Sequence, residues 1–121
     1  MTKAPPDGYT LLLTLSNHVS NPKQYLKLPY DTERDFQPIA HIGASPMLMY
    51  GLFAPGATPV ALVTQINRDV VEVLTEAELR ERFATAGVAP RTGTPAEFRE
   101  FVSCEISRWS KLIGDIGLKP G

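Results

Sequence analysis

The stretch Tyr9-Thr10-Leu11-Leu12-Leu13-Thr14-Leu15 is the part of this 121-residue sequence that most directly indicates the fold. Its apolar residues run almost without interruption, and at about seven residues the run is too short for a typical helix. Strands that are buried on both faces, as in the parallel sheets of α/β proteins, have this pattern. Turn residues come before it, because Pro5-Pro6-Asp7-Gly8 combines the fixed φ of proline with the positive φ that glycine accepts. The sequence therefore predicts a strand over 9–15 in a parallel α/β sheet.

A polar, turn-prone segment follows this strand directly and runs from Ser16 to Pro22. We predict a loop there, at the carboxyl end of the strand, which is the edge where open α/β sheets bind ligands. His18 lies in this loop and is the best single candidate for a site residue. The alternative is a structural histidine that bonds to nearby backbone.

Short apolar segments predict further strands farther along the chain. They lie over 39–42, 46–50, 51–54 and 88–92. The other histidine, His41, falls inside the first of them, and we expect it to be packed or at an edge rather than functional.

Three amphipathic helices are predicted in the second half of the chain. Thr58 is expected to cap the first helix, with Pro59 at its first position. Thr75 and Glu78 form a capping-box pattern for the second helix, and Thr94 to Glu97 repeat that pattern for the third. Strands together with helices indicate a single α/β domain.

Composition and charge exclude several function classes. With 12 basic and 13 acidic residues the net charge is −1, so no strong field attracts nucleic acid. Two distant histidines and the single Cys104, which we expect to be buried, give no metal-ligand pattern, and we expect no cofactor. Ser16 and His18 lie close in sequence without a G-x-S-x-G elbow, so we expect no enzyme.

The first residues, Met1 to Pro6, contain no apolar signal core. The longest apolar runs are far shorter than the ~20 residues that a membrane helix needs. From the sequence we expect a soluble chain without an export signal.

Two ordered blocks of motifs resemble the Bug family, the solute-binding receptors of tripartite tricarboxylate transport systems. The first block holds Ala4-Pro5-Pro6-Asp7-Gly8-Tyr9-Thr10, Asn21-Pro22, Leu28-Pro29-Tyr30-Asp31 and Asp35-Phe36-Gln37-Pro38-Ile39-Ala40. The second holds Tyr50-Gly51-Leu52-Phe53-Ala54-Pro55, Thr58-Pro59 and the helices through Lys119. Residues 1–49 resemble a segment of the family's N-terminal lobe, and residues 50–121 resemble its C-terminal segment. We therefore expect a seam near Tyr50, where the material between the two parts is absent.

The resemblance implies a partial periplasmic-binding-protein architecture of type 2, built from first-lobe strands and C-terminal helices. It also implies a periplasmic receptor that binds a small carboxylate and delivers it to membrane transporter subunits. Carried over by position, Ser16, Asn17 and His18 face the cleft between the lobes and would bind the ligand. Leu15 and Asn17 depart from the small hydroxyl residues and glycine that are common in the family.

The function predicted from the resemblance is thus carboxylate binding in an uptake system, weakened or lost in this shortened chain. The alternative is a self-associating structural or interaction domain without a ligand. Missing sheet neighbours would leave the strand over 9–15 as an unpaired edge, which favours a homodimer.

Overall fold

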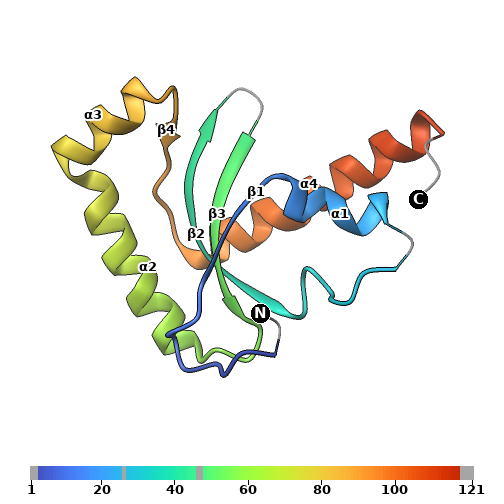
Figure 1. Cartoon of the computed structure of the whole chain (residues 1–121), viewed down its shortest axis with the longest axis horizontal. Coiled ribbons are helices and arrows are strands. Elements are labelled where there is room, and N and C mark those ends of the chain that lie inside the picture. The colour runs from blue at the N-terminus through green and yellow to red at the C-terminus, as the bar shows by residue number, and fades with distance from the viewer. Residues whose placement is uncertain (1–2, 26, 46–47, 118–121) are drawn as a thin grey trace.

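The computed structural model describes residues 3–25, 27–45 and 48–117. These residues form a four-stranded sheet with helices on both faces (Figure 1). In chain order the elements are β1 (Leu12–Leu15), α1 (Asn17–Gln24), β2 (Phe36–Ser45), β3 (Leu48–Pro55), α2 (Val60–Thr75), α3 (Ala77–Thr85), β4 (Ala89–Pro90) and α4 (Pro95–Asp115).

The strands lie in the order β1-β3-β2-β4, and every neighbouring pair is antiparallel. The prediction of a parallel sheet was therefore wrong. The reason is that β2 and β3 follow each other along the chain and pair over most of their length, from Phe36 opposite Pro55 to Ser45 opposite Leu48. Consecutive strands that pair in antiparallel fashion can be joined by a short turn, whereas parallel strands need a crossover connection, usually a helix.

The predicted strand over 9–15 is shorter and more exposed than its sequence suggested. It pairs over Leu12–Leu15 with β3 and, within the part of the chain that the structure describes, forms the edge of the sheet. Leu13 is 62% exposed and Tyr9 is 93% exposed. Burial on both faces was wrong because α2 packs on β2 rather than on β1, so one face of β1 lacks a covering helix among the described elements.

Two long strands, β2 and β3, replace the separate short strands that were expected between residues 39 and 54. Pro46, in one of those predicted strands, lies outside the described residues. Tyr50, where the seam was predicted, lies within β3, opposite Leu15 of β1 on one side and Gly43 of β2 on the other.

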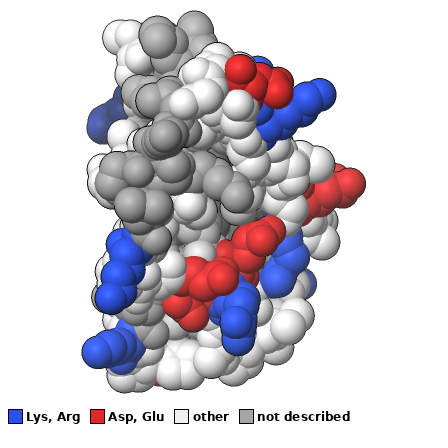
Figure 2. Space-filling model, turned by 90° about the vertical axis from the view of Figure 1, so that its right-hand side faces the viewer, with Lys and Arg blue, Asp and Glu red and all other residues white. Residues whose placement is uncertain are grey.

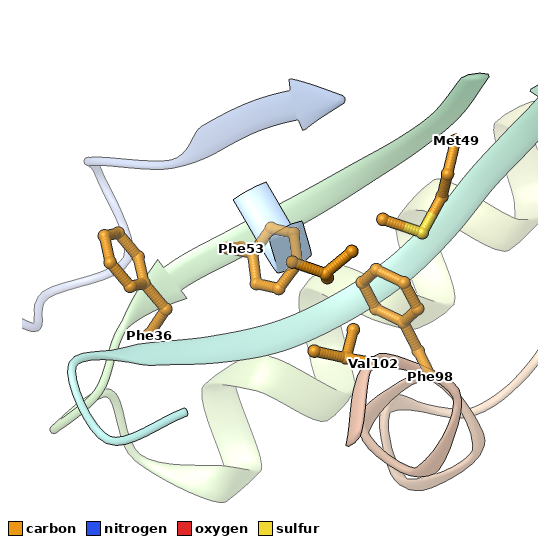
Figure 3. Packing of buried hydrophobic residues seen from close by; sticks show 6 residues of the cluster. Phe36, Met49, Phe53, Phe98 and Val102 are labelled. Carbon is orange, nitrogen blue, oxygen red and sulfur yellow. The ribbon is translucent and has the colours of Figure 1, made fainter. Parts of the chain in front are cut away.

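Hydrophobic clusters lie on both faces of the sheet. On the face of α1 and α4, Phe53 packs with residues of both helices and of β2 (Figure 3). This cluster consists of Val19, Phe36, Met49, Phe53, Phe98 and Val102. On the face of α2, the cluster consists of Ile39, Ala40, Ala54 and Val63. Because Phe53 and Ala54 of β3 point to opposite faces, the sheet lies between the two clusters and forms the central layer of the molecule.

The helix starts agree only in part with their sequence signals. Thr94 and Glu97 form the predicted capping box of α4, with the Glu97 backbone N–H donating to Thr94 Oγ1 at 3.2 Å. Thr58 is buried and does not cap α2, which begins after Pro59. Thr75 does not cap α3 either, because its hydroxyl donates to the Glu72 carbonyl in the last turn of α2.

Cys104 was predicted to be buried, but it is exposed because it lies on the outer side of α4, away from Phe98 and Val102.

Among residues 3–25, 27–45 and 48–117, none of the helices combines the length and the apolar character needed to cross a bilayer.

Candidate functional site

The segment predicted as a ligand-binding loop is a helix. Residues Asn17–Gln24 form α1 directly after β1, with Pro22 inside the helix. Proline lacks the N–H that would bond to the carbonyl of His18, four residues earlier. The Thr32 hydroxyl donates to that carbonyl instead, at 3.4 Å, so a residue outside the helix makes proline tolerable there. The loop prediction was therefore wrong, although the segment does lie at the carboxyl end of β1.

The start of α1 is open to an incoming group. Ser16 occupies the cap position, and within the described residues no side chain bonds to the first N–H groups and no acidic residue lies in the first turn. Asn17 is exposed and Ser16 is half-buried. Helix N-termini carry free N–H donors and partial positive charge, which makes them suited to anions. Ser16, Asn17 and the backbone N–H of His18 can therefore present donors to a carboxylate.

The His18 ring points away from this surface, into the hydrophobic cluster. His18 is only 4% exposed, and its ring centroid lies 4.8 Å from those of both Phe36 and Phe53 and 6.0 Å from that of Tyr30. Its Nε2 atom has no hydrogen-bond partner among the described residues. Burial lowers the pKa of His18 from 6.5 to about 4, so the ring is neutral near pH 7. The imidazole therefore fixes α1 against the sheet.

Three further strands reach the same end of the sheet as the start of α1. Leu15, the last residue of β1, is opposite Tyr50 of β3, Tyr50 is opposite Gly43 of β2, and Gly43 is opposite Pro90 of β4. This row of four residues crosses the sheet at the end where the pairing of β2 with β3 closes, with Ser45 opposite Leu48. Ser16 and Asn17 thus lie at one end of the sheet, whereas the ring of His18 packs on the face that α1 and α4 cover.

The structure also brings together residues that the sequence did not nominate. A cavity of about 250 Å³ lies between β2, the segment after β4 and the start of α4, and His41, Arg91 and Glu97 are among its lining residues. Burial and the nearby Arg91 guanidinium lower the pKa of His41, against a backbone hydrogen bond at Gly43 that raises it. Its ring stacks on that of Phe98 at 5.6 Å. No local signal links residue 41 to residues 91–97, so only the fold reveals this cavity.

Charges of both signs are interspersed on the face shown in Figure 2. Within the described residues of that face, acidic side chains alternate with basic ones, so no large single-sign patch covers it. Within the part of the chain that the structure describes, no group of three or more His, Cys, Asp or Glu side chains has the arrangement of a metal site.

Comparison with known sequences gives a family match in the first part of the chain. Residues 1–50 match the family model described as "Tripartite tricarboxylate transporter family receptor". Protein BugT of Bordetella pertussis is 33% identical over 70 residues, which cover 58% of this chain and 22% of BugT. A "UPF0065 protein in tcbD-tcbE intergenic region" of Pseudomonas sp. is 29% identical over 63 residues, which cover 52% of this chain and 19% of that protein. The chain thus spans about a fifth of the length of the curated relatives that it matches.

Solved structures match nearly the whole fold. The periplasmic binding protein BugD aligns with a TM-score of 0.87 and 13% identity, over 99% of this chain and 82% of that chain. The protein Rpa4515 of R. palustris, solved with adipate, aligns with a TM-score of 0.86 and 16% identity over 99% of this chain and 82% of that chain. MatC of Rhodopseudomonas palustris, solved with bound malate, aligns with a TM-score of 0.82 and 15% identity over 93% of this chain and 81% of that chain.

These matches confirm the fold class as a partial α/β architecture of the periplasmic-binding-protein kind. The matching family is one of transport receptors and not of enzymes. The chain is thus similar to the family of tripartite tricarboxylate transporter receptors in sequence over residues 1–50, and similar in fold to the periplasmic binding protein BugD over 99% of its length.

Proposed function

We propose that this chain is part of a solute-binding receptor for small carboxylates in a tripartite tricarboxylate-type uptake system. It would act in the periplasm and pass its ligand to membrane transporter subunits, without catalysis and without a cofactor. Residues 1–49 and 50–121 would form one domain, in which the family's N-terminal and C-terminal segments share the sheet.

The observation that carries the proposal is the open start of α1 at the carboxyl end of β1. A ligand carboxylate there would accept hydrogen bonds from the backbone N–H groups of Asn17 and His18 and from the Ser16 hydroxyl. Hydrogen bonds to an ionised carboxylate are roughly twice as strong as those between neutral groups. The relatives solved with adipate and malate both hold dicarboxylic acids, which supports a carboxylate as the ligand class.

We further propose that binding by residues 1–121 alone is weak. Two-lobed receptors gain affinity when the ligand bridges both lobes and stabilises the closed state. The start of α1 supplies donors from one side only. Affinity is therefore expected in the millimolar range, at about 4 kcal/mol of binding free energy.

Thermal unfolding with a panel of small carboxylates tests the proposal. At a concentration ten times its dissociation constant, a bound acid stabilises the fold by about 1.4 kcal/mol, which raises the midpoint by a few degrees. Asn17→Asp is the discriminating variant. Its carboxylate interacts favourably with the helix dipole, which stabilises the fold by about 0.3–1 kcal/mol, but it repels the ligand's carboxylate. We expect a folded variant whose midpoint no acid moves.

The matched control is Gln65→Glu, which adds the same charge at an exposed position of α2. Its response to the acids should equal that of the wild type. Equal responses of the wild type and Asn17→Asp would place the binding site elsewhere, and no response of the wild type to any acid would contradict carboxylate binding by this chain.

A second candidate function, a self-associating domain without ligand, is favoured by one observation. The edge strand β1 leaves Leu13 62% exposed and Leu11 39% exposed. Light scattering over a range of protein concentrations tests it, and a monomer at every concentration would exclude it.

A further inference from the structure

We propose that protonation of His18 releases α1 from the sheet, together with the backbone donors that face the carboxylate. The neutral ring holds the helix in place, whereas a charged ring is not stable in that position. This release deepens the proposed function, on which its consequence for the ligand rests, by adding control by pH to the same site.

The ring of His18 lies in an aromatic environment. Its centroid is 4.8 Å from those of Phe36 of β2 and Phe53 of β3, and Tyr30 stacks on it at 6.0 Å. His18 is 4% exposed, and its Nε2 atom has no hydrogen-bond partner among the described residues. A proton on this ring would place a charge among apolar groups that cannot replace its hydration, and this burial lowers the pKa of His18 to about 4.

The charged groups around α1 are engaged elsewhere or exposed, so burial alone accounts for this lowered pKa. β1, β2 and β3 contain no Asp, Glu, Lys or Arg, and His41 of β2 stacks on Phe98 instead. On α1 the charged residue is Lys23, five positions after His18, whereas neighbours on one helix face are three or four apart. The Tyr30 hydroxyl accepts from Asn21 Nδ2 at 3.2 Å.

The remaining charged groups belong to the segment before β2 and to α4, and each is either bonded to another group or exposed. Asp31 accepts from the backbone N–H groups of Glu33 and Arg34, Asp35 accepts from that of Asp31, Glu33 accepts from the Ser103 hydroxyl, Arg99 donates to Gln37, Arg108 pairs with Glu105, and Arg34, Glu97, Glu100, Lys111 and Asp115 are exposed.

α1 depends on its contacts with the rest of the fold. It has eight residues, contains Pro22 and has no side-chain cap among the described residues. Helices this short are not stable alone in water. Its buried residues His18 and Val19 attach it to the face of the sheet that α4 also covers, whereas the cluster around Ile39 lies on the opposite face. α1 can therefore open locally, at a lower free energy than global unfolding, while the α2 face stays packed.

Acid favours the released state of α1. The released ring titrates with the ordinary pKa of 6.5, and the docked ring with a pKa of about 4. Between these values the released ring holds a proton and the docked ring does not, so the ratio of released to docked α1 rises about 5- to 20-fold from pH 7 to pH 5. The N–H groups of Asn17 and His18 lie in the first turn of α1, so release removes them from the ligand site. A carboxylate bound to them favours the docked state in return.

Amide hydrogen exchange, measured by NMR without any ligand, tests the release. The exchange rates of the Asn21, Gln24 and Tyr25 amides, each divided by the intrinsic rate at that pH, give the opening equilibrium of α1. We expect this equilibrium to rise about 5- to 20-fold from pH 7 to pH 5 in the wild type and to stay constant in His18→Leu and His18→Gln. The matched control is His41→Gln, which removes the other histidine and should keep the rise.

Two results would overturn the proposal. One is an equal change of the opening equilibrium in the wild type and in both His18 variants. The other is exchange of the α1 amides that is only as fast as that of the β3 amides, because α1 would then open only when the whole fold does.

Adipate tests the consequence for the ligand. At pH 7 and ten times its dissociation constant, it should lower the opening equilibrium of α1 about tenfold in the wild type and not in Asn17→Asp, with sodium chloride at equal ionic strength as the control. Adipate that shifts the thermal midpoint but leaves the opening of α1 unchanged would refute the coupling between His18 and the ligand. If α1 opens with acid as expected but adipate does not bind, the proposed function fails and the release of α1 stands.

Discussion

His18 gives the sharpest prediction about the stability of this fold. Its ring is buried among Tyr30, Phe36 and Phe53, and burial lowers its pKa from 6.5 to about 4. The unfolded chain therefore binds a proton more readily than the folded one between these two values. The stabilisation from keeping the ring neutral is complete above pH 6.5 and is lost as the pH falls towards 4.

The magnitude follows from the size of this pKa difference. A shift of one unit corresponds to about 1.36 kcal/mol, and between pH 7 and pH 5 linkage gives a loss of about 2 kcal/mol in the free energy of unfolding. Residual solvent screening reduces this to about 1–2 kcal/mol. The pKa of His41 is lowered as well and adds a loss of the same sign.

Urea unfolding at pH 7 and pH 5 measures the loss, with His18→Leu and His18→Gln as the two comparison variants. Neither variant titrates at this position, so both should lose less stability on acidification than the wild type, whatever their stability at pH 7. His18→Leu also removes the Nε2 atom that has no partner among the described residues, so it should fold at least as well as His18→Gln. If the wild type and both variants lose the same free energy from pH 7 to pH 5, the reasoning about His18 is refuted.

Three more predictions concern the sheet and the helix contacts. Phe53→Ala, at a side chain with 0% exposure, should cost about 3–5 kcal/mol, whereas Leu112→Ala, at 47% exposure, should cost less than about 1 kcal/mol; urea unfolding of both checks this. The side-chain amide of Asn67 donates to the carbonyls of Ile39 and Gly93 at 2.8 and 2.9 Å. Asn67→Ala removes this donor and should lower the free energy of unfolding by about 1–3 kcal/mol. Gln65→Ala, at a neighbouring exposed position, should leave it unchanged. Thr94→Ala removes the capping box of α4 and should lower the free energy of unfolding by about 1 kcal/mol, which is measured as a lower thermal midpoint. An unchanged midpoint would show that the cap contributes nothing.

Features set by neighbours in sequence were predictable. Thr94, Pro95 and Glu97 specify the start of α4 because all of the groups in a capping box lie within one helical turn. A glycine just after a helix typically adopts the left-handed conformation that ends it, and Gly87, just after α3, has a positive φ of 70°. The turn before the first strand is confirmed in the same way, with Gly8 at φ 84°.

Features set by distant residues were not predictable. The apolar run over 9–15 has the pattern of a buried strand, but its burial depends on which elements pack beside it. Among the described residues, β3 is the one strand that pairs with β1. A helix over Asn17–Gln24 looks improbable with Pro22 inside it. It forms because Thr32, which follows the helix in a separate segment, satisfies the carbonyl that proline leaves free.

The candidate site shows the same division. The sequence drew attention to His18 of α1, but the direction of its ring is set by Phe36 of β2 and Phe53 of β3. The cavity with His41, Arg91 and Glu97 gave no local signal at all. The part of the site that resemblance did identify, Ser16 and Asn17, lies at the surface at the start of α1, and its contact with a ligand stays a prediction.

The central claim is that the start of α1 forms one wall of a carboxylate site, and amide NMR shifts during titration with adipate and malate test it most directly. The account predicts saturable shifts that centre on the amides of Asn17 and His18, in the millimolar range, and that disappear in Asn17→Asp but not in Gln65→Glu. An absence of saturable shifts, or shifts that centre on another part of the fold and persist in Asn17→Asp, would contradict it.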